Sequence, residues 1–381
     1  MSEVVSLRAV FIHSPQLEDY GYPAGCPFVT KRAALTRKTV SAMGLLAGPD
    51  RAERFPVPAT RGDIETFHTP RYLDTLQRAE AGHLDVDGLY MGLGTADCPI
   101  FKGVYDYAAL ACGATLAGAR LLLAGETRIA FNPSGGFHHA FPERAAGFCY
   151  VNDVAIACME LAARSKRVLY LDVDVHHGDG VQHAFYERSD VMTISLHETG
   201  KLIFPGTGFE DEIGAGEGKG YAVNVPLQPG TYDDAYMKAF DAVVMPLAPA
   251  FDPDVIVLEL GLDALAGDPL AHLALTNNTY VKILGRVLGL DKPLLVTGGG
   301  GYHVDNTVRG WALAWAVLCG EDEADGSNVG LGGVMMGTTD WHGGLHDRAL
   351  VPSDEQRREV EPAIEATIEA IRANVFPLHG L

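Results

Sequence analysis

Short apolar runs recur along the chain, and each is followed by Gly, His or Asp. They cover residues 128–132, 168–175, 191–196, 255–260 and 293–297. Between them, the stretches 104–123, 151–164 and 232–248 show the apolar spacing of helices. Apolar strands that alternate with helices are typical of a parallel sheet covered on both faces. Ligand sites in such folds lie beyond the carboxyl ends of the strands, where the polar residues of this chain gather.

The length of 381 residues allows one large α/β domain or two smaller ones. We predict a single domain over 1–381 with a core of about 10–320, followed by a C-terminal loop and covering helix over 321–381. The Gly- and Asp-rich segment 320–344 is interpreted as loop. Ser353 and Gln356 have the spacing of a capping box that opens a helix reaching about Asn374.

The net charge of −20 disfavours direct binding of nucleic acid, because phosphate backbones would be repelled. An acidic surface attracts cationic ligands such as basic peptides or polyamines, or it serves solubility alone. The six cysteines include no Cys-x-x-Cys pair, so neither a structural zinc site nor a disulfide framework is predicted. We find no secretory signal and no apolar run long enough to span a membrane, and we expect a cytoplasmic protein.

One segment combines acids and histidines at the end of an apolar run. Residues two apart in a strand point the same way, so Asp172, Asp174 and His176 are predicted to share a face. Such a group is costly to bury without a cation or hydrogen bonds, and a hydrogen-bonded polar strand end is the alternative to a metal site. Asp263, after the apolar run 255–260, would complete the three protein ligands of a catalytic zinc.

Two further segments carry candidate catalytic groups. His138 and His139 follow a Gly-Gly turn, and paired imidazoles beside a metal can act as acid and base. Asp172 and Asp179 are available to orient them. The segment 297–303 contains four glycines but lacks the Lys-Ser/Thr of a phosphate loop, and Tyr302 at its end can donate a hydrogen bond to a developing oxyanion.

These segments, in this order, resemble the zinc-dependent histone deacetylase superfamily over about residues 10–320. Segments 92–101, 204–208 and 260–269 bring the chain closer to the class I enzymes and the bacterial acetoin-utilisation deacetylases. The resemblance implies a three-layer α/β/α domain with a central, mostly parallel, eight-stranded sheet of arginase-like type. It also implies removal of acetyl or other short acyl groups from lysine side chains of proteins.

The resemblance carries over to individual residues. The ligands of one zinc ion are matched by Asp174, His176 and Asp263. The tandem catalytic histidines are matched by His138 and His139, with Asp172 and Asp179 as their partners. Tyr302 matches the tyrosine that polarises the carbonyl. The residues that match the substrate tunnel are Asp97, Gly147, Phe148, Phe204 and Leu270, with Arg32 matching an arginine near the acetate exit.

The family also binds potassium. An inner potassium site is matched by Asp172, Asp174, His176, Ser195 and Leu196. An outer site is matched by Phe185, Val191 and Tyr221, and at a further position of this outer site Arg188 stands where a smaller residue is expected. A second departure is Glu259, at a position where glutamine or an apolar residue is expected. Glu259 and Asp263 lie an even number of positions apart in the sequence, so both side chains are predicted to point to the same face. Glu259 is interpreted either as a protonated structural acid or as a group that tunes the site.

Three other functions compete with protein deacetylation. An acetylpolyamine amidohydrolase would use the same catalytic core on a small cationic substrate. An arginase-like ureohydrolase would need a second manganese ion and further Asp-x-His-x-Asp ligands, which the sequence lacks. A non-enzymatic acyl-ligand sensor would be expected to lose a ligand, a histidine or the tyrosine, and all are present.

Overall fold

The computed structural model of the chain describes residues 7–164, 166–321 and 344–381. An eight-stranded sheet runs through the molecule in the order β2-β1-β3-β8-β7-β4-β5-β6, and every neighbouring pair is parallel. The strands are β1 (Leu7–Ile12), β2 (Arg51–Arg54), β3 (Thr127–Asn132), β4 (Val168–Asp172), β5 (Val191–Glu198), β6 (Ala222–Leu227), β7 (Val255–Glu259) and β8 (Leu294–Thr297).

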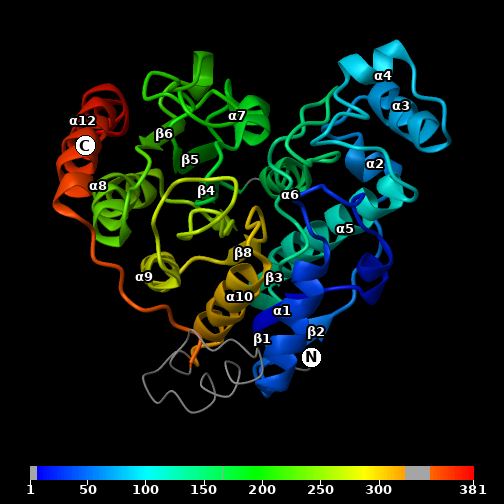
Figure 1. The fold of residues 1–381 in the computed structure, drawn as a ribbon, viewed down its shortest axis with the longest axis horizontal. Coiled ribbons are helices and arrows are strands. Elements are labelled where there is room, and N and C mark those ends of the chain that lie inside the picture. Colours follow the sequence, from blue (N-terminus) through cyan, green and yellow to red (C-terminus); the bar gives the residue numbers. More distant parts are fainter. Residues whose placement is uncertain (1–6, 165, 322–343) are drawn as a thin grey trace.

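Helices cover both faces of this sheet (Figure 1). One face packs against α1 (Lys31–Ala42), α8 (Asp233–Phe251), α9 (Asn277–Leu288), α10 (Val304–Leu318) and α12 (Asp354–Asn374). The other packs against α2 (Arg61–Ile64), α3 (Pro70–Glu80), α5 (Val104–Leu123), α6 (Asp153–Ala162) and α7 (Asp179–Phe185). The short helix α4 (Val86–Tyr90) lies beside α3, at the upper right of Figure 1. The predicted three-layer α/β/α architecture is therefore confirmed.

The sequence missed three strands, and each has a physical reason. β2 reads Arg-Ala-Glu-Arg and is an edge strand, so it lacks the apolar signal of a buried strand. β1 is the first element among the described residues, so no described helix stands before it to complete the alternating pattern. β6 contains Asn224 and Pro226, and proline is tolerated there because this strand is the other edge of the sheet.

The prediction of a strand over 168–175 is wrong at its end, because β4 stops at Asp172. The side chain of Asp172 turns back and accepts a hydrogen bond from the amide of Asp174 (3.0 Å). Asp174 does the same for the amide of His176 (2.9 Å). Local side-chain hydrogen bonds of this kind replace the ladder of a strand with a turn. Asp174 and His176 are therefore placed by a loop and not by strand alternation.

The C-terminal helix begins as predicted, with a reciprocal capping box between Ser353 and Gln356. Its apolar face, including Val360, Ile364 and Ile368, joins the same core as the sheet, and α12 lies against α8 and the edge strand β6 (Figure 1). The loop predicted over 320–344 lies almost wholly outside the described residues. Among the helices that are described, none has the length and apolarity to cross a membrane. All six cysteines are free.

Candidate active site and metal centre

Three adjacent strands deliver the candidate site residues to one edge of the sheet. In the register of the sheet, Asp172 of β4 pairs with Glu259 of β7, and Glu259 pairs with Thr297 of β8. The loops that follow these strands therefore leave the sheet side by side. The carboxyl ends of parallel strands are where such folds place their ligands.

Glycines let these loops approach one another. A Cβ on Gly261 would lie 2.0 Å from Oδ2 of Asp174, and one on Gly300 would lie 1.9 Å from Oδ2 of Asp263. Any side chain at either position would collide with a carboxylate. The amide of Gly300 instead donates to Oδ2 of Asp174 at 2.6 Å, so the glycine-rich loop holds this acid in place.

Asp174, His176 and Asp263 form a buried cluster with the geometry of a metal site. Nδ1 of His176 lies 3.3 Å from Oδ1 of Asp174 and 3.0 Å from Oδ2 of Asp263. Tetrahedral zinc, with bonds of about 2.0–2.2 Å, separates its ligand atoms by about 3.3–3.6 Å. The residues present thus fit a zinc ion after a shift of a few tenths of an ångström.

The electrostatics of this cluster also favour a cation at its centre. Burial disfavours a charged ring, yet hydrogen bonds to Asp174 and Asp263 raise the pKa of His176 to about 10. Burial, together with the charge of Asp174, raises the pKa of Asp263 to about 7. Two carboxylates around one imidazole therefore require a positive charge, which a proton on His176 or a metal ion supplies.

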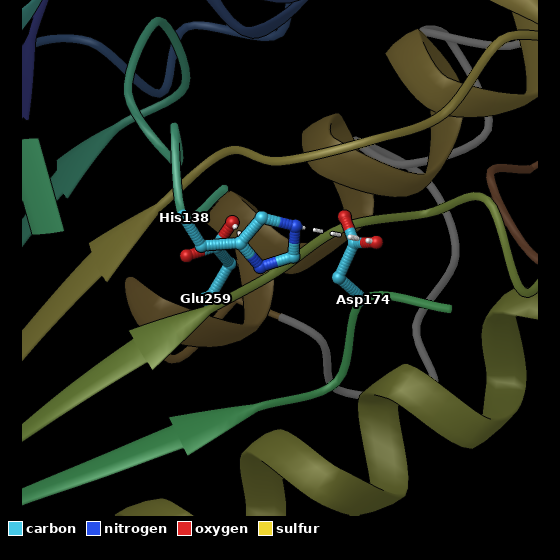
Figure 2. A group of neighbouring side chains, drawn as sticks. All are labelled: His138, Asp174 and Glu259. Atoms are coloured by element: carbon cyan, nitrogen blue, oxygen red, sulfur yellow. Dashed lines mark ion pairs between the residues drawn. The ribbon is translucent and has the colours of Figure 1, made fainter. Parts of the chain in front are cut away.

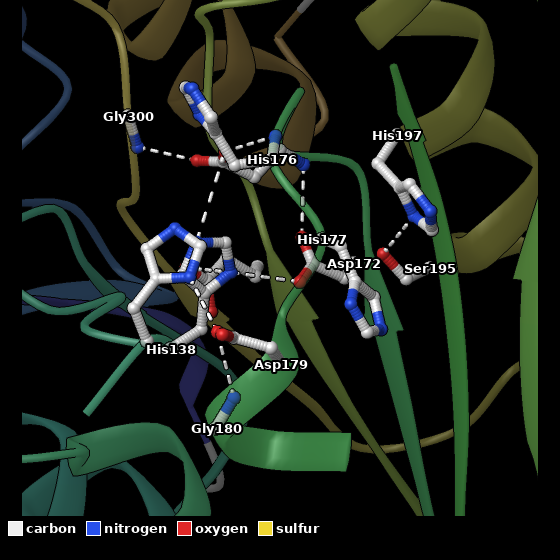
Figure 3. A network of polar contacts seen from close by, with 12 residues as sticks. His138, Asp172, His176, His177, Asp179, Gly180, Ser195, His197 and Gly300 are labelled. Atoms are coloured by element: carbon white, nitrogen blue, oxygen red, sulfur yellow. Dashed lines mark hydrogen bonds and ion pairs between the residues drawn. The ribbon is translucent and has the colours of Figure 1, made fainter. Parts of the chain in front are cut away.

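The rings of the two adjacent histidines lie 4.0 Å apart between centroids, and each is held by its own carboxylate. His138, Asp172 and Asp179 are labelled in Figure 3. Nδ1 of His138 lies 2.9 Å from Oδ2 of Asp172, and Nδ1 of His139 lies 2.8 Å from Oδ1 of Asp179. The two Nε2 atoms are 2.9 Å apart. If each Nδ1 carries a hydrogen, one Nε2 must carry one too, because two lone pairs would repel at this distance. With both Nδ1 hydrogens in place, one ring of the pair is an imidazolium.

The surroundings of the rings identify which one holds the extra proton. Burial opposes a charge on His138, but Glu259, Asp172 and Asp174 raise the pKa of His138 well above its ordinary value. Burial and the neighbouring charges of His138 and His176 lower the pKa of His139 well below its ordinary value. His138 is thus the donor and His139 the neutral acceptor.

A second group of possible ligands comprises His138, Asp174 and Glu259 (Figure 2). His138 meets Glu259 through Nδ1 (3.1 Å) but faces Asp174 through Nε2 (3.9 Å). The two acids therefore lie against opposite nitrogens of the ring, and one ion could not use both contacts. This arrangement suits a proton-bearing imidazole better than a second metal.

Aromatic side chains surround the candidate metal site. The ring of Phe204 lies 4.9 Å from that of His139, and the ring of Phe148 lies 5.6 Å from that of Tyr302. The Tyr302 ring is in turn 6.3 Å from that of His176. The two phenylalanines predicted to form tunnel walls and the predicted oxyanion donor thus gather around the same centre.

The other predicted substrate residues lie nearby but already have partners within the chain. Asp97 accepts hydrogen bonds from the amide of Gly147 (3.0 Å) and from the hydroxyl of Thr95 (2.7 Å). The amide of Leu270 donates to Asp268 (2.9 Å). Asp97 and Gly147 therefore fix each other, and their contact with a substrate stays a prediction.

Arg32 is buried and serves the glycine-rich loop. Its guanidinium donates to the carbonyls of Gly301 (2.6 Å) and Gly299 (3.0 Å). The same group stacks over the rings of Phe28 and Trp311. Arg32 therefore supports the segment that carries Tyr302, and its relation to a product exit stays a prediction.

The predicted potassium residues occupy two separate places. Ser195 pairs with Asp172 across β5 and β4, and Leu196 is buried beside it. Val191, at the start of β5, and Phe185, at the end of α7, are buried, whereas Arg188 forms two hydrogen bonds with Asp190. The ring of Tyr221 contacts Phe251 and His379. Potassium binding at either place stays a prediction.

His177 lies away from the candidate metal ligands. It contacts Thr207 through Nδ1 (2.9 Å) and Gln182 through Nε2 (3.2 Å), and its ring packs on His197. The prediction that this histidine faces away from the zinc ligands agrees with its position in Figure 3.

Sequence reasoning missed two residues that support the site. Tyr170, whose hydroxyl lies 2.6 Å from Oδ2 of Asp172, precedes that acid by two residues in β4, so strand parity could have indicated it. Asp268 accepts the amide hydrogen bonds of both Tyr302 (2.7 Å) and Leu270. Nothing in the sequence pattern indicates that Asp268 connects those two loops.

Comparison with known proteins agrees with this geometry. Residues 26–318 match the model of the histone deacetylase domain. Histone deacetylase 8 of Xenopus tropicalis is 42% identical over 321 residues, which cover 83% of this chain and 85% of the relative. The acetoin utilization protein AcuC of Bacillus subtilis is 39% identical over 322 residues, covering 82% of this chain and 83% of that protein.

Solved structures are similar as well. The crystal structure of an HDAC homologue from Aquifex aeolicus superposes with a TM-score of 0.82 at 31% identity, covering 95% of this chain and all of that chain. The sheet, the cluster of buried acids and histidines, and the match over most of the sequence lead to one conclusion: this chain belongs to the histone deacetylase family.

Proposed function

We propose that this protein is a zinc-dependent deacetylase that removes acetyl or other short acyl groups from lysine side chains of proteins. The observation that carries the proposal is the cluster of Asp174, His176 and Asp263 next to the paired histidines. A catalytic zinc has three protein ligands and an open position, and a closed structural site would need a fourth. Family membership supports hydrolytic deacetylation as the reaction class.

Asp174, His176 and Asp263 would hold the zinc ion. When bound, zinc supplies Lewis acidity to the amide carbonyl and to the attacking water. His139 is suited to be the general base, because it is neutral and Asp179 holds its Nδ1 hydrogen. Water would replace the present contact between the two Nε2 atoms and give its proton to Nε2 of His139.

Tyr302 and His138 would stabilise the charge that develops during the reaction. Burial, with the charges of Asp263 and Asp174, raises the pKa of Tyr302 well above its ordinary value, so its hydroxyl keeps the hydrogen that it donates to the carbonyl oxygen. His138 would remain protonated as a nearby positive charge. His139 would then return its proton to the leaving amine, giving a carboxylate and free lysine.

A substrate panel with the purified zinc-loaded protein tests the proposal. The panel comprises an acetyl-lysine peptide, peptides with longer acyl chains, and acetylputrescine. We expect hydrolysis of the peptide with a higher kcat/KM than for acetylputrescine. Preference for acetylputrescine would favour the amidohydrolase alternative, and no turnover of any member would favour an acyl-ligand sensor.

Metal analysis tests the ligand set independently of turnover. One zinc ion per chain is expected, and Asp263→Asn should lower the affinity for zinc. Two bound transition metals would favour a binuclear site of the ureohydrolase kind. Unchanged zinc affinity in Asp263→Asn would exclude Asp263 as a ligand.

A further inference from the structure

Glu259 is a buried acid at the end of β7 that the mechanism above does not use. Its side chain has no solvent exposure. Oε2 lies 3.0 Å from the hydroxyl oxygen of Tyr170, and Oε1 lies 3.1 Å from Nδ1 of His138. Figure 2 shows the carboxyl group directed at the His138 ring. The acid therefore lies beside the histidine on the side opposite its Nε2 contact with His139.

Glu259 and Asp172 contact the same two groups. Oδ2 of Asp172 is 2.9 Å from Nδ1 of His138 and 2.6 Å from the hydroxyl of Tyr170. The four side chains thus form a closed ring in which two acids flank one imidazole and one phenol. The strand register explains this, because Asp172 and Glu259 are direct partners in β4 and β7.

The four side chains of this closed ring have few hydrogens to share among their oxygen and nitrogen atoms. Tyr170 has one hydrogen and His138 has one at Nδ1, while the two acids present four oxygens. The Nδ1 hydrogen points at Asp172, so Oε1 of Glu259 accepts no well-aligned hydrogen bond although it is buried. A buried oxygen without a partner is costly unless it shares a neighbouring donor. Nδ1 of His138 is the donor that lies within reach.

A protonated Glu259 resolves this arrangement. Burial raises the pKa of Glu259 well above its ordinary value, and the nearby Asp172 and Asp174 raise it further, although His138 opposes them. With its hydrogen on Oε2, Glu259 donates to Tyr170, and Tyr170 donates to Asp172. Oε1 then faces His138 as a carbonyl oxygen that shares the Nδ1 hydrogen with Asp172.

We propose that Glu259 is a positioning residue that, together with Asp172 and Tyr170, fixes the His138 ring through its Nδ1 hydrogen and so sets the distance between His138 and His139. Glu259 contributes a second acceptor oxygen for the Nδ1 hydrogen of His138 and not a second negative charge beside the imidazole. In its catalytic consequence the inference rests on the proposed deacetylation, because His138 acts there beside the general base.

The test compares two substitutions that separate shape from hydrogen bonding. Glu259→Gln keeps an acceptor oxygen towards His138 and an amide donor towards Tyr170. Glu259→Leu keeps the approximate volume and removes both contacts. Glu80→Gln is the matched control, since Glu80 also accepts two hydrogen bonds, from the amides of Gly103 and Tyr105, but takes no part in the site.

We expect Glu259→Leu to lower kcat by about 10–100-fold, the usual cost of removing a supporting partner in such a site, with KM little changed. Glu259→Gln should restore most of kcat, and Glu80→Gln should match the wild type. All variants should retain one zinc ion per chain. A Glu259→Gln variant as impaired as Glu259→Leu, or full activity in Glu259→Leu, would overturn the proposal.

A spectroscopic readout separates this inference from the proposed function. In protein labelled with ¹⁵N-histidine, the His138 Nδ1 hydrogen should give the same proton signal in the wild type and Glu259→Gln, and a shifted signal in Glu259→Leu. The signal does not depend on turnover, so an inactive wild type would contradict the deacetylase proposal and leave this test intact.

Two further results complete the design. Should Glu259→Leu fail to fold, Tyr170→Phe removes the hydroxyl that joins the two acids and should likewise shift the His138 signal. An unchanged signal in Tyr170→Phe would contradict the closed ring. A second metal ion in the wild type that is lost in Glu259→Gln would assign Glu259 to a metal site and overturn its positioning role.

Discussion

His138 and His139 are neighbours in sequence, yet their surroundings move their pKa values in opposite directions. Three acids surround His138, whereas His139 has Asp179 and the positive charges of two other histidines. The difference lets two identical side chains take different roles. Paired titratable groups with opposed environments are a recurrent way to assign an acid and a base within one site.

The hydroxyl of Tyr302 offers a direct test at this scale. Tyr302→Phe removes the proposed donor to the carbonyl oxygen while keeping the ring against Phe148. Loss of one oxyanion donor typically costs about 10²–10³-fold in kcat. We expect a loss of this order with zinc content unchanged, measured by steady-state hydrolysis of an acetyl-lysine peptide and by metal analysis. Full activity would exclude the oxyanion role.

His68 allows a prediction about stability that is independent of the metal. It is buried, its Nε2 accepts the amide hydrogen of Asn152 (2.9 Å), and burial lowers its pKa to about 3. The unfolded chain, with a pKa near 6.5 at this position, binds the proton first as the pH falls. The stabilising contribution of His68 is therefore present above pH 6.5 and is lost between about pH 6.5 and 3.

His68→Gln keeps an acceptor for Asn152 and removes this titration. In urea unfolding between pH 7.5 and 4.5, the free energy of unfolding of the wild type should fall relative to the variant below pH 6.5. The expected slope approaches about 1.4 kcal/mol per pH unit. A difference between the two proteins that does not change with pH would contradict the assignment.

At the scale of elements, the sequence predicted the site better than it predicted the route of the chain. Acids and histidines at the ends of apolar runs were enough to group Asp174, His176 and Asp263, because parallel strands end at one edge. The conformation of 173–178 could not be predicted, because it depends on hydrogen bonds between side chains and backbone. The parity of Glu259 indicated its face, but its ring of contacts with Tyr170 required the register of β4 and β7.

The close approach of the loops after β7 and β8 makes a second prediction. Gly261→Ala places a methyl group against the carboxylate of Asp174, which must then move. We expect the zinc affinity to fall by about 10–100-fold, as when a partner of a metal ligand is lost. Gly285→Ala is the control, since it has open space in α9 and alanine there favours the helix by about 1 kcal/mol. Equal zinc affinity in both variants would contradict the close contact.

At the scale of the whole molecule, metal binding should contribute to stability. Removing zinc leaves buried acids that only protons can neutralise, and a ligand that binds the folded state alone stabilises it by about 4 kcal/mol at a thousand times its Kd. We expect chelation to lower the Tm, and added zinc to restore it in the wild type but not in Asp263→Asn. A Tm insensitive to chelation would place the metal outside the core that we describe.

The acidic surface, with a net charge of −20, acts at the same scale. It suits basic peptide segments or polyamines equally, because long-range attraction distinguishes sign and not shape. The net charge therefore could not predict which of the two substrate classes, basic peptides or polyamines, the protein takes. Under the proposed function, the choice between these substrates would depend on the arrangement of Phe148, Phe204 and Leu270, which only the folded loops define.

The order of the strands has a consequence for how the protein is made. Of the strands that the structure describes, β7 and β8 are the last two to be synthesised, yet they occupy the middle of the sheet and join its two halves. Asp263 follows His176 by 87 residues, so it is synthesised well after the histidine that it contacts in the folded protein. A ribosome-bound chain therefore has no complete cage for a metal ion until the central strands insert. We infer that a metal ion bound by this cluster would be loaded after the central strands have been inserted, so that the folded site and not the nascent chain would select the ion.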